Sequence, residues 1–448
     1  MAETNMTVPA SRTRSPGFKL FIIAALTVLM AAPLFVIELA LVDRQDRAQE
    51  AYQDIANGWG GVQTIAGPLL FVPYTQTVIT TEDGHNVQRT DRSVAVLLPS
   101  TLDLDTKTAM GTRWRGIFSV PVYTAGVGVK AGFDKAALDK LLPEGATPLW
   151  DQAYASMLVS DVRGLTGNVT MSVNGKPVSF QPGIGVDGSS VSGIHAPLGL
   201  TAAPNGLMLS AGLTLRGSRE LNFASLGQQT TAHLSSSWPD PSFSGAFLPN
   251  TRNIGQKGFD AAWNVPYFAR GYGQSFGSPE SALNTVLNGT FGVKFYQPVD
   301  FYQLVQRSLK YAILFVGLAF LVFFVAEMIV GRRLHAAQYT LMGAAQVLFY
   351  LLLLSFAEHI GFALAYGVAA AATVTLTAFY AASAFASRLR AAALFAVLGG
   401  LYGLLYVILV QEDYALLIGA LVLFFALGTT MFATRKLDWS RIVPEPTR

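Results

Sequence analysis

The sequence contains no cysteine and little charge. None of its 448 residues is a cysteine, and only 13% are Asp, Glu, Lys or Arg. The missing thiols exclude disulfide bonds, thiolate catalysis and cysteine-ligated metals. A soluble protein carries about 25% charged residues, so the low charge indicates a membrane protein or one with a large membrane part. The formal net charge of +3 comes without a basic cluster, which argues against a nucleic-acid partner.

Signals for enzymatic chemistry are also scarce. The chain holds five histidines, and we recognise no HExxH or other metal-ligand spacing among them. We expect no serine-hydrolase nucleophile turn of the G-x-S-x-G type and no phosphate-binding or dinucleotide-binding glycine loop between a strand and a helix. Asp161, His195 and a serine could meet in the folded domain by chance, and we do not expect them to form a catalytic triad. The sequence therefore predicts no catalytic residue, no metal and no cofactor.

Long apolar runs predict six membrane spans. The clearest run covers residues 311–330, which is long enough to cross a hydrocarbon core of about 30 Å as a helix. The first run exceeds the 7–15 apolar residues of a signal peptide, so we expect an uncleaved anchor. The predicted spans are residues 18–42, 311–330, 338–356, 362–386, 391–410 and 414–432.

Basic residues beside these spans predict the orientation, because cytoplasmic loops are enriched in Lys and Arg. Both termini then face the cytoplasm. The predicted division is a cytoplasmic tail (1–17), the first span (18–42), an outer domain (43–306), five further spans (307–436) and a second cytoplasmic tail (437–448). The basic residues are Arg12, Arg14, Arg332, Arg333, Arg388, Arg390, Arg435 and Lys436.

The region between the first and second spans is predicted to be rich in β-strands. Its apolar runs are short, and hairpins are expected around Asp83-Gly84 and Asn174-Gly175. We expect a strand that breaks at Gly217-Ser218, a short helix near residues 133–142 and a weaker one at residues 151–157. The strand order stays open, as does a division into two subdomains near residues 183–193. The expected fold class is an α+β membrane protein with a β-rich domain inserted between spans one and two.

Two short turns on the predicted outer side form a candidate site. They join spans three to four and five to six, and both are too short to leave the membrane surface. The carboxylates of these turns need hydrogen-bond donors near the apolar boundary. The candidate donors are Arg307, Lys310 and His359. We interpret the turns as a polar cluster that fixes the outer domain on the bundle, with proton or solute handling as the alternative. The residues are Glu358, His359, Glu412 and Asp413.

Other acidic residues in the spans receive a simpler interpretation. Glu38 and Glu327 lie near predicted span ends. We expect both to reach lipid headgroups or water, because an ionised side chain is costly at membrane depth.

Aromatic residues beside prolines mark a second candidate site. The segment Trp238-Pro239-x-Pro241-x-Phe243 combines large side chains with restricted backbone. It suits a rigid structural loop or a docking surface, and we favour the structural role.

Several sequence blocks together resemble the inner-membrane protein CreD family. They lie between residues 59 and 439, and their combination is specific although each alone is not. The blocks are Trp59-Gly60-x-x-Gln63, Gly67-Pro68, Pro73-Tyr74, Arg115-Gly116-Ile117-Phe118, Ser237-Trp238-Pro239-x-Pro241-Ser242-Phe243, Phe247-Leu248-Pro249, Gly258-Phe259-x-Ala261-x-Trp263, Arg307-Ser308-x-Lys310-Tyr311, Gln338-Tyr339, Glu358-His359-Ile360-Gly361-Phe362 and Glu412-Asp413-Tyr414-Ala415-Leu416-Leu417.

The resemblance implies a bacterial inner-membrane protein with its outer domain in the periplasm and a role in envelope integrity or stress response. It implies no reaction. The expected partners are the lipid bilayer and a periplasmic or envelope component, and the oligomeric state stays open. A transporter or flippase-like protein is the alternative, and a hydrolase of envelope material is a third possibility.

Overall fold

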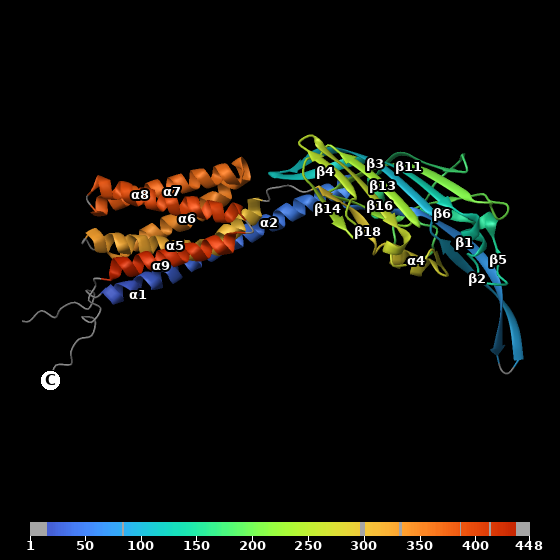
Figure 1. The fold of residues 1–448 in the computed structure, drawn as a ribbon, viewed down its shortest axis with the longest axis horizontal. Coiled ribbons are helices and arrows are strands. Elements are labelled where there is room, and N and C mark those ends of the chain that lie inside the picture. Colours follow the sequence, from blue (N-terminus) through green and yellow to red (C-terminus); the bar gives the residue numbers. More distant parts are fainter. Residues whose placement is uncertain are drawn as a thin grey trace, which may run out of the picture. The chain divides into compact units, whose positions relative to one another are not determined.

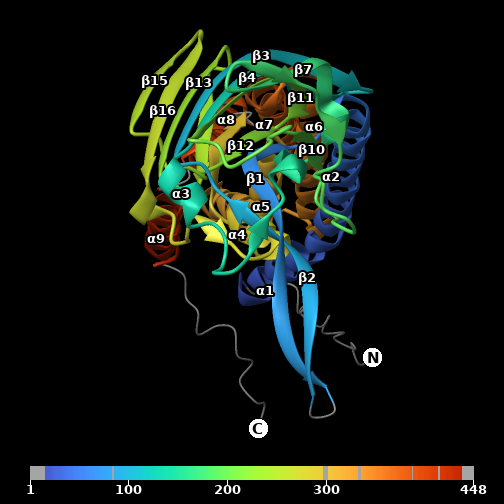
Figure 2. The same ribbon diagram turned by 90° about the vertical axis from the view of Figure 1, so that its right-hand side faces the viewer.

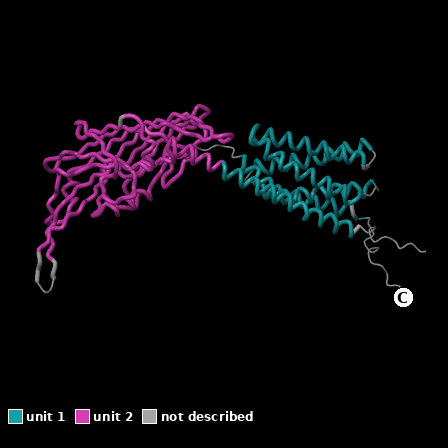
Figure 3. The backbone as a smooth tube through the Cα atoms, turned by 180° about the vertical axis from the view of Figure 1, so that it is seen from behind, with its two compact units in different colours: residues 1–47, 299–448 teal, residues 48–298 magenta. Residues whose placement is uncertain are grey.

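A computed structural model describes residues 16–82, 85–295, 301–330, 334–385, 387–411 and 414–435. The chain divides into two compact units (Figure 3). The helical unit comprises residues 1–47 and 299–448, and the β unit comprises residues 48–298. The Asp83-Gly84 pair, the basic loop residues Arg332 and Arg333, and most of both predicted tails lie outside the described residues.

Long apolar helices build the helical unit (Figure 1). Six helical segments among the described residues are long and apolar enough to span a membrane, one near the N-terminus and five near the C-terminus. This confirms the predicted set of spans. The first segment combines two helices separated at Met30, and its second helix continues into the β unit. The helices are α1 (Pro16–Leu29), α2 (Ala31–Trp59), α5 (Phe301–Val330), α6 (Ala336–Ile360), α7 (Phe362–Phe385), α8 (Arg388–Val410) and α9 (Ala415–Thr434).

Local capping explains where these helices begin and end. His335 and Gln338 form a reciprocal capping box at the start of α6. Gly361, with φ of 76°, separates α6 from α7, a conformation that a residue with a Cβ adopts at a cost. The Ser387 side chain accepts a hydrogen bond from the Arg390 N–H and caps α8. Short turns of this kind pack α6 against α7 and α7 against α8.

Two sheets form the β unit. The first has ten strands, with β14-β18-β12-β1-β6-β10-β9 in order and β2, β5 and β17 paired beside this path. Its strands are β1 (Gln63–Glu82), β2 (His85–Leu97), β5 (Thr147–Pro148), β6 (Tyr154–Val159), β9 (Gln181–Pro182), β10 (Gly193–Pro197), β12 (Glu220–Ala224), β14 (Pro241–Gly245), β17 (Ser275–Phe276) and β18 (Thr290–Phe295).

The second sheet has eight strands in the order β15-β16-β13-β3-β4-β11-β7-β8, part of which can be followed in Figure 2. Its strands are β3 (Thr101–Arg115), β4 (Phe118–Phe133), β7 (Leu165–Val173), β8 (Lys176–Val178), β11 (Leu207–Ser218), β13 (Gln229–Ser236), β15 (Thr251–Gly255) and β16 (Gly258–Pro266). The short helices α3 (Lys135–Asp139) and α4 (Pro279–Val286) complete the unit.

A single apolar core joins the two sheets. Large buried side chains come from both, among them Phe71 and Phe223 from the first sheet and Tyr123 and Phe133 from the second. The chain crosses repeatedly between the two sheets, often after a pair of strands, so neither sheet is a contiguous piece of sequence. The β unit is therefore one body, and the open possibility of two subdomains is excluded.

Several local predictions for this region are confirmed and two are wrong. Strands β1 and β2 pair along their length, and β7 and β8 flank a turn in which Asn174 and Gly175 both have positive φ. The weak helix predicted at residues 151–157 is wrong, because strand β6 runs there with its side chains buried between neighbours. The break between β11 and β12 falls at Arg219, with φ of 62°, rather than at Gly217-Ser218, and the two strands enter different sheets.

Candidate functional sites

Glu358 lies near the end of α6 and is buried, with 6% of its side chain exposed. The Tyr302 hydroxyl of α5 donates to Oε1 of Glu358 over 3.1 Å. Nε of Arg44, on α2, lies 3.6 Å from the same oxygen. A buried carboxylate requires such donors because desolvation otherwise disfavours its charge. Glu358 therefore joins α6 to α5 and to the distant helix α2.

His359, a second residue of the predicted outer cluster, has different surroundings. The His359 side chain is exposed, and its Nδ1 lies 3.0 Å from the Ser355 carbonyl oxygen one turn earlier on the same helix. Glu412 and Asp413 lie outside the described residues. The cluster of four stays a prediction. Sequence reasoning missed Arg44 as a partner of Glu358, although Arg44 follows the first predicted span by only two positions.

Glu327 was expected to reach headgroups or water, and the structure shows that it does not. It is buried on α5, where it forms an ion pair with Lys19 of α1 and accepts a hydrogen bond of 3.1 Å from the Tyr339 hydroxyl of α6. Lys19 Nζ also donates to the Leu334 carbonyl oxygen over 2.9 Å. The expectation was wrong because a lysine from another span neutralises the carboxylate inside the protein. Glu38, by contrast, is exposed.

The two buried carboxylates therefore share one arrangement. Each contacts a cation from the first span and a tyrosine from a neighbouring helix, so the first span is joined to both α5 and α6 at each site. Paired and hydrogen-bonded groups of this kind hold helices together. The polar contacts described for Glu327 and Glu358 serve assembly of the bundle.

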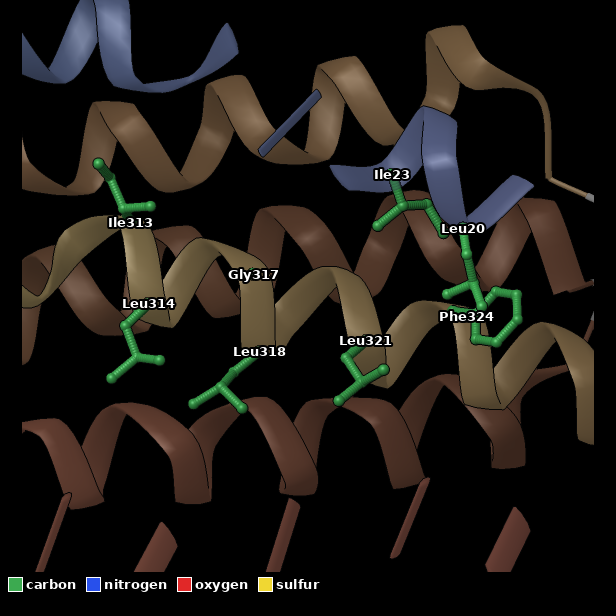
Figure 4. Close-up of a pocket in the computed structure, with 8 residues that line it drawn as sticks. All are labelled: Leu20, Ile23, Ile313, Leu314, Gly317, Leu318, Leu321 and Phe324. Atoms are coloured by element: carbon green, nitrogen blue, oxygen red, sulfur yellow. The ribbon is translucent and has the colours of Figure 1, made fainter. Parts of the chain in front are cut away.

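An apolar groove lies between α1 and α5 (Figure 4). Leu20 and Ile23 come from α1, and the other six lining residues come from α5. Its volume is about 300 Å³, and its lining offers no polar side chain. Such a surface suits contact with acyl chains or another apolar helix and has no chemistry of its own.

The aromatic-proline segment contacts both sheets. The Phe243 ring of β14 lies edge-to-face with Phe259 and Trp263 of β16, with centroid distances of 5.6 and 5.7 Å. Trp238 is half-buried and packs against the core. Pro239 and Pro241 are also half-buried. These contacts favour the structural interpretation, and a docking role for the segment stays untested.

The block Trp59-Gly60-x-x-Gln63 surrounds the point where α2 ends and β1 begins. Gln63 is fully buried, and its Nε2 donates to the Asp161 and Arg216 carbonyl oxygens over 3.0 and 2.9 Å. The guanidinium groups of Arg113 and Arg216 lie 4.2 and 4.4 Å from the Trp59 ring. Cation–π contacts and buried hydrogen bonds of this kind stabilise the junction. These contacts give the block a structural role at the junction of α2 and β1.

The residues considered for a hydrolase triad are engaged elsewhere. A hydrogen bond from Arg163 lowers the pKa of Asp161, which also accepts from the Gly61 N–H over 3.1 Å. His195 Nδ1 lies 2.8 Å from the Gly183 carbonyl oxygen. These partners belong to the local backbone and to a salt bridge, and they leave Asp161 and His195 in separate contacts.

Residues 273–277 do spell G-x-S-x-G, contrary to the expectation that no such motif occurs. Ser275, at its centre, pairs with Leu97 as part of strand β17. A hydrolase nucleophile instead sits on a sharp turn between a strand and a helix. Within the described ranges, no group of three or more His, Asp or Glu side chains is arranged to hold a metal ion.

A polar groove of about 740 Å³ lies on the outer face of the eight-stranded sheet. Side chains from β3, β4, β7, β11 and β13 line it, because alternate residues of adjacent strands share one face. Sequence reasoning missed this site because the strand register was unknown. The residues that carry its polar groups are Asp103, Asp105, Lys130, Thr170, Ser172, Ser210 and His233.

His233 links three strands at one end of this groove. Its Nδ1 lies 3.1 Å from Oδ1 of Asp105 on β3, and its Nε2 lies 2.8 Å from Oδ2 of Asp260 on β16. The hydrogen bond to Asp105, with a further one to Asp260, raises the pKa of His233 above its usual value. Protonation of the imidazole would let both ring nitrogens donate.

The fold defines a multi-pass membrane protein in which a two-sheet β unit separates the first span from the remaining five. The sequence profile described as "Inner membrane protein CreD" matches residues 15–440. The Inner membrane protein CreD of Escherichia coli (strain K12) is 33% identical over 437 residues, which cover 95% of this chain and 94% of that protein. The chain belongs to the CreD family of inner-membrane proteins.

Proposed function

We propose that this protein supports the integrity of the bacterial cell envelope by binding an envelope component through its β unit, without catalysing a reaction. In this proposal the β unit faces the periplasm and both termini face the cytoplasm. The flanking Lys and Arg residues support that orientation. Membership of the CreD family supports the location in the inner membrane.

The observation that carries the proposal is the contrast between the polar groups of the two units. In the helical unit, Glu327 and Glu358 already have cationic and tyrosine partners. In the β unit, the polar groove presents carboxylates, hydroxyls and one lysine to solvent. Polar groups that converge on an open hollow are available to a ligand, so binding by the β unit is the function that the geometry favours.

Cysteine labelling tests the orientation, and the absence of natural cysteines makes each label unambiguous. Thr90→Cys places a thiol on an exposed position of β2, and Thr4→Cys places one in the N-terminal tail. A membrane-impermeant maleimide should label Thr90→Cys in spheroplasts and Thr4→Cys only after lysis. The reverse pattern would refute the proposal.

Complementation tests the role. A strain that lacks this gene and carries an envelope defect should be restored by the full-length protein and not by a version with a damaged groove. Restoration by the helical unit alone would show that the β unit is dispensable and would refute binding as the function.

A transporter or flippase-like activity is the second candidate. It is favoured by the burial of two carboxylates inside the helical unit, because ionisable groups within transmembrane helices often mark translocation pathways. Glu327→Gln and Glu358→Gln should then abolish lipid scrambling by the protein reconstituted in liposomes. Under the binding proposal, the wild-type protein shows no such activity.

A further inference from the structure

Two glycines, Gly128 and Gly212, pair with each other among the residues of the polar groove, and we call them its floor. Gly128 of β4 pairs with Asp105 of β3 on one side and with Gly212 of β11 on the other, and Gly212 pairs with Thr170 of β7. A Cβ placed on Gly128 would meet only the Asp105 carbonyl oxygen, at 3.6 Å, which is an ordinary contact. Neither packing nor a positive φ therefore requires glycine at position 128.

Glycine inside a strand has an energetic cost. It weakens the strand, and it is found where a ligand or another backbone approaches closely. Gly128 occupies the middle of a long strand in the interior of the sheet. Glycine at this position leaves the backbone accessible to a ligand, although the fold itself would accept a side chain there.

A polar row borders this floor. Cross-strand pairing places Asp103, Lys130, Ser210 and Ser172 side by side on β3, β4, β11 and β7. The two serine hydroxyls lie 2.7 Å apart, and Asp103 accepts a hydrogen bond of 2.7 Å from Thr231. Asp105 and His233 pair with each other and stand in the same cross-strand line as Gly128 and Gly212, next to this row. The side chains offer both donors and acceptors within a short distance of the floor.

The chemistry of the lining narrows the class of ligand. The central strands β4 and β11 are paired on both sides, so a peptide cannot add to the sheet as an extra strand. Two carboxylates oppose Lys130 and His233, so the groove favours neither an anion nor a cation. The lining includes no Phe, Tyr or Trp side chain. Its apolar members Leu104, Val129, Met171 and Ala211 are buried in the core, so they offer little surface to an acyl chain. A neutral ligand with many hydroxyl groups satisfies these conditions.

We propose that the groove binds a neutral saccharide chain, with sugar rings lying over Gly128 and Gly212. Asp103 and Asp105 would accept hydrogen bonds from sugar hydroxyls, and Ser172, Ser210 and Thr170 could donate or accept. This inference deepens the proposed function. It rests on the proposed periplasmic location of the β unit, which would give envelope saccharides access to the groove.

Binding of soluble oligosaccharides to the whole protein tests the inference. The protein is placed in lipid nanodiscs, because the sugar headgroup of a maltoside detergent would compete. Chitotetraose and maltohexaose serve as neutral probes and dextran sulfate as an anionic control, with affinity measured by calorimetry. At least one neutral probe should bind, and dextran sulfate should not.

Substitutions locate the binding. Gly128→Val fills the floor and should weaken binding by about tenfold or more. Ser172→Ala combined with Ser210→Ala removes two hydroxyls without adding volume and should also weaken it. Gly111→Val is the matched control, because Gly111 lies farther along β3 on the same outward face and its Cβ would meet only Val122, at 3.8 Å. This variant should bind like the wild type.

The outcomes separate the inference from the proposed function. Absence of binding by both neutral probes, binding of dextran sulfate alone, or unchanged affinity in both groove variants would overturn the saccharide inference. If the wild type also restores the envelope in complementation, the proposed function survives that result. If the probes bind as expected but Thr90→Cys is labelled only after lysis, the proposed function fails while the binding site stands.

Discussion

The helical unit and the β unit use polar side chains in opposite ways. In the helical unit, Glu327 and Glu358 are buried and meet cations from the first span. In the β unit, Asp105 and His233 also pair, but both side chains are exposed on an open sheet face. A hydrocarbon surrounding penalises an unpaired charge far more than water does. Charges in the spans therefore serve assembly, whereas charges on the sheet remain available for recognition.

The largest expected effect concerns the contact between the two sheets. Trp263→Ala removes a buried ring that touches Phe243 and Phe291, and it should lower the free energy of unfolding by about 3–5 kcal/mol. Phe243→Ala should act in the same direction with a smaller effect, because Phe243 is only half-buried. Protein abundance and thermal unfolding of the purified protein measure both. Phe268→Ala is the control, because that ring is 94% exposed.

A different result would alter the comparison between the units. If Trp238→Ala or Phe243→Ala accumulates normally yet loses function in cells, the aromatic-proline segment is a contact surface. The β unit would then present a second recognition face in addition to the groove.

The next effect concerns the buried pair in the spans. Glu327→Gln leaves Lys19 without its counter-ion and should reduce stability by up to about 3 kcal/mol, because an uncompensated buried charge is unfavourable. Lys19 is partly exposed, which limits the loss. Thermal unfolding in detergent is the measurement, with Glu38→Gln as the exposed control. Equal stability of the two variants would show that the Glu327 pair does not hold the helices together.

A smaller effect is expected at Glu358. Tyr302→Phe removes one hydrogen bond to a charged group and should cost about 1.5–3 kcal/mol. Combining it with Glu358→Gln should give less than the sum of the two single effects, because both changes remove the same contact. Strictly additive losses in the thermal unfolding of the three variants would argue against coupling between α5 and α6 at this position.

The smallest effect is a pH dependence in the β unit. His233 has a pKa raised by Asp105 and Asp260, so its contribution to stability is fully present below the unfolded pKa of about 6.5 and is lost as the pH rises through the raised folded value. The site is partly exposed, so the contribution should stay below about 1 kcal/mol. Unfolding of His233→Gln, measured across neutral and mildly alkaline pH, should lose this dependence. An unchanged pH profile would show that the titration of His233 does not contribute to the stability of the three strands that it links.

The sequence by itself determined the number and position of the spans, because each apolar run is long enough to cross a bilayer as a helix. It also determined the Asn174-Gly175 hairpin, whose turn requires positive φ at both central residues. The helix expected at residues 151–157, by contrast, is not formed, because strand β6 occupies most of this segment. Ala155 and Met157 suit a helix locally, and only their burial between β1 and β10 made the segment a strand.

The tertiary structure alone decided which distant residues meet. Lys19 and Glu327 are 308 positions apart, and local sequence contains no information on that pairing. The groove depends on strand register in the same way, because Asp105, Gly128, Gly212 and Thr170 come from four strands and align only once the sheet has formed. A shift of one residue in any strand would turn its groove residues toward the core. Long-range pairing, which local propensity does not specify, is therefore what created both the buried ion pairs and the open polar face.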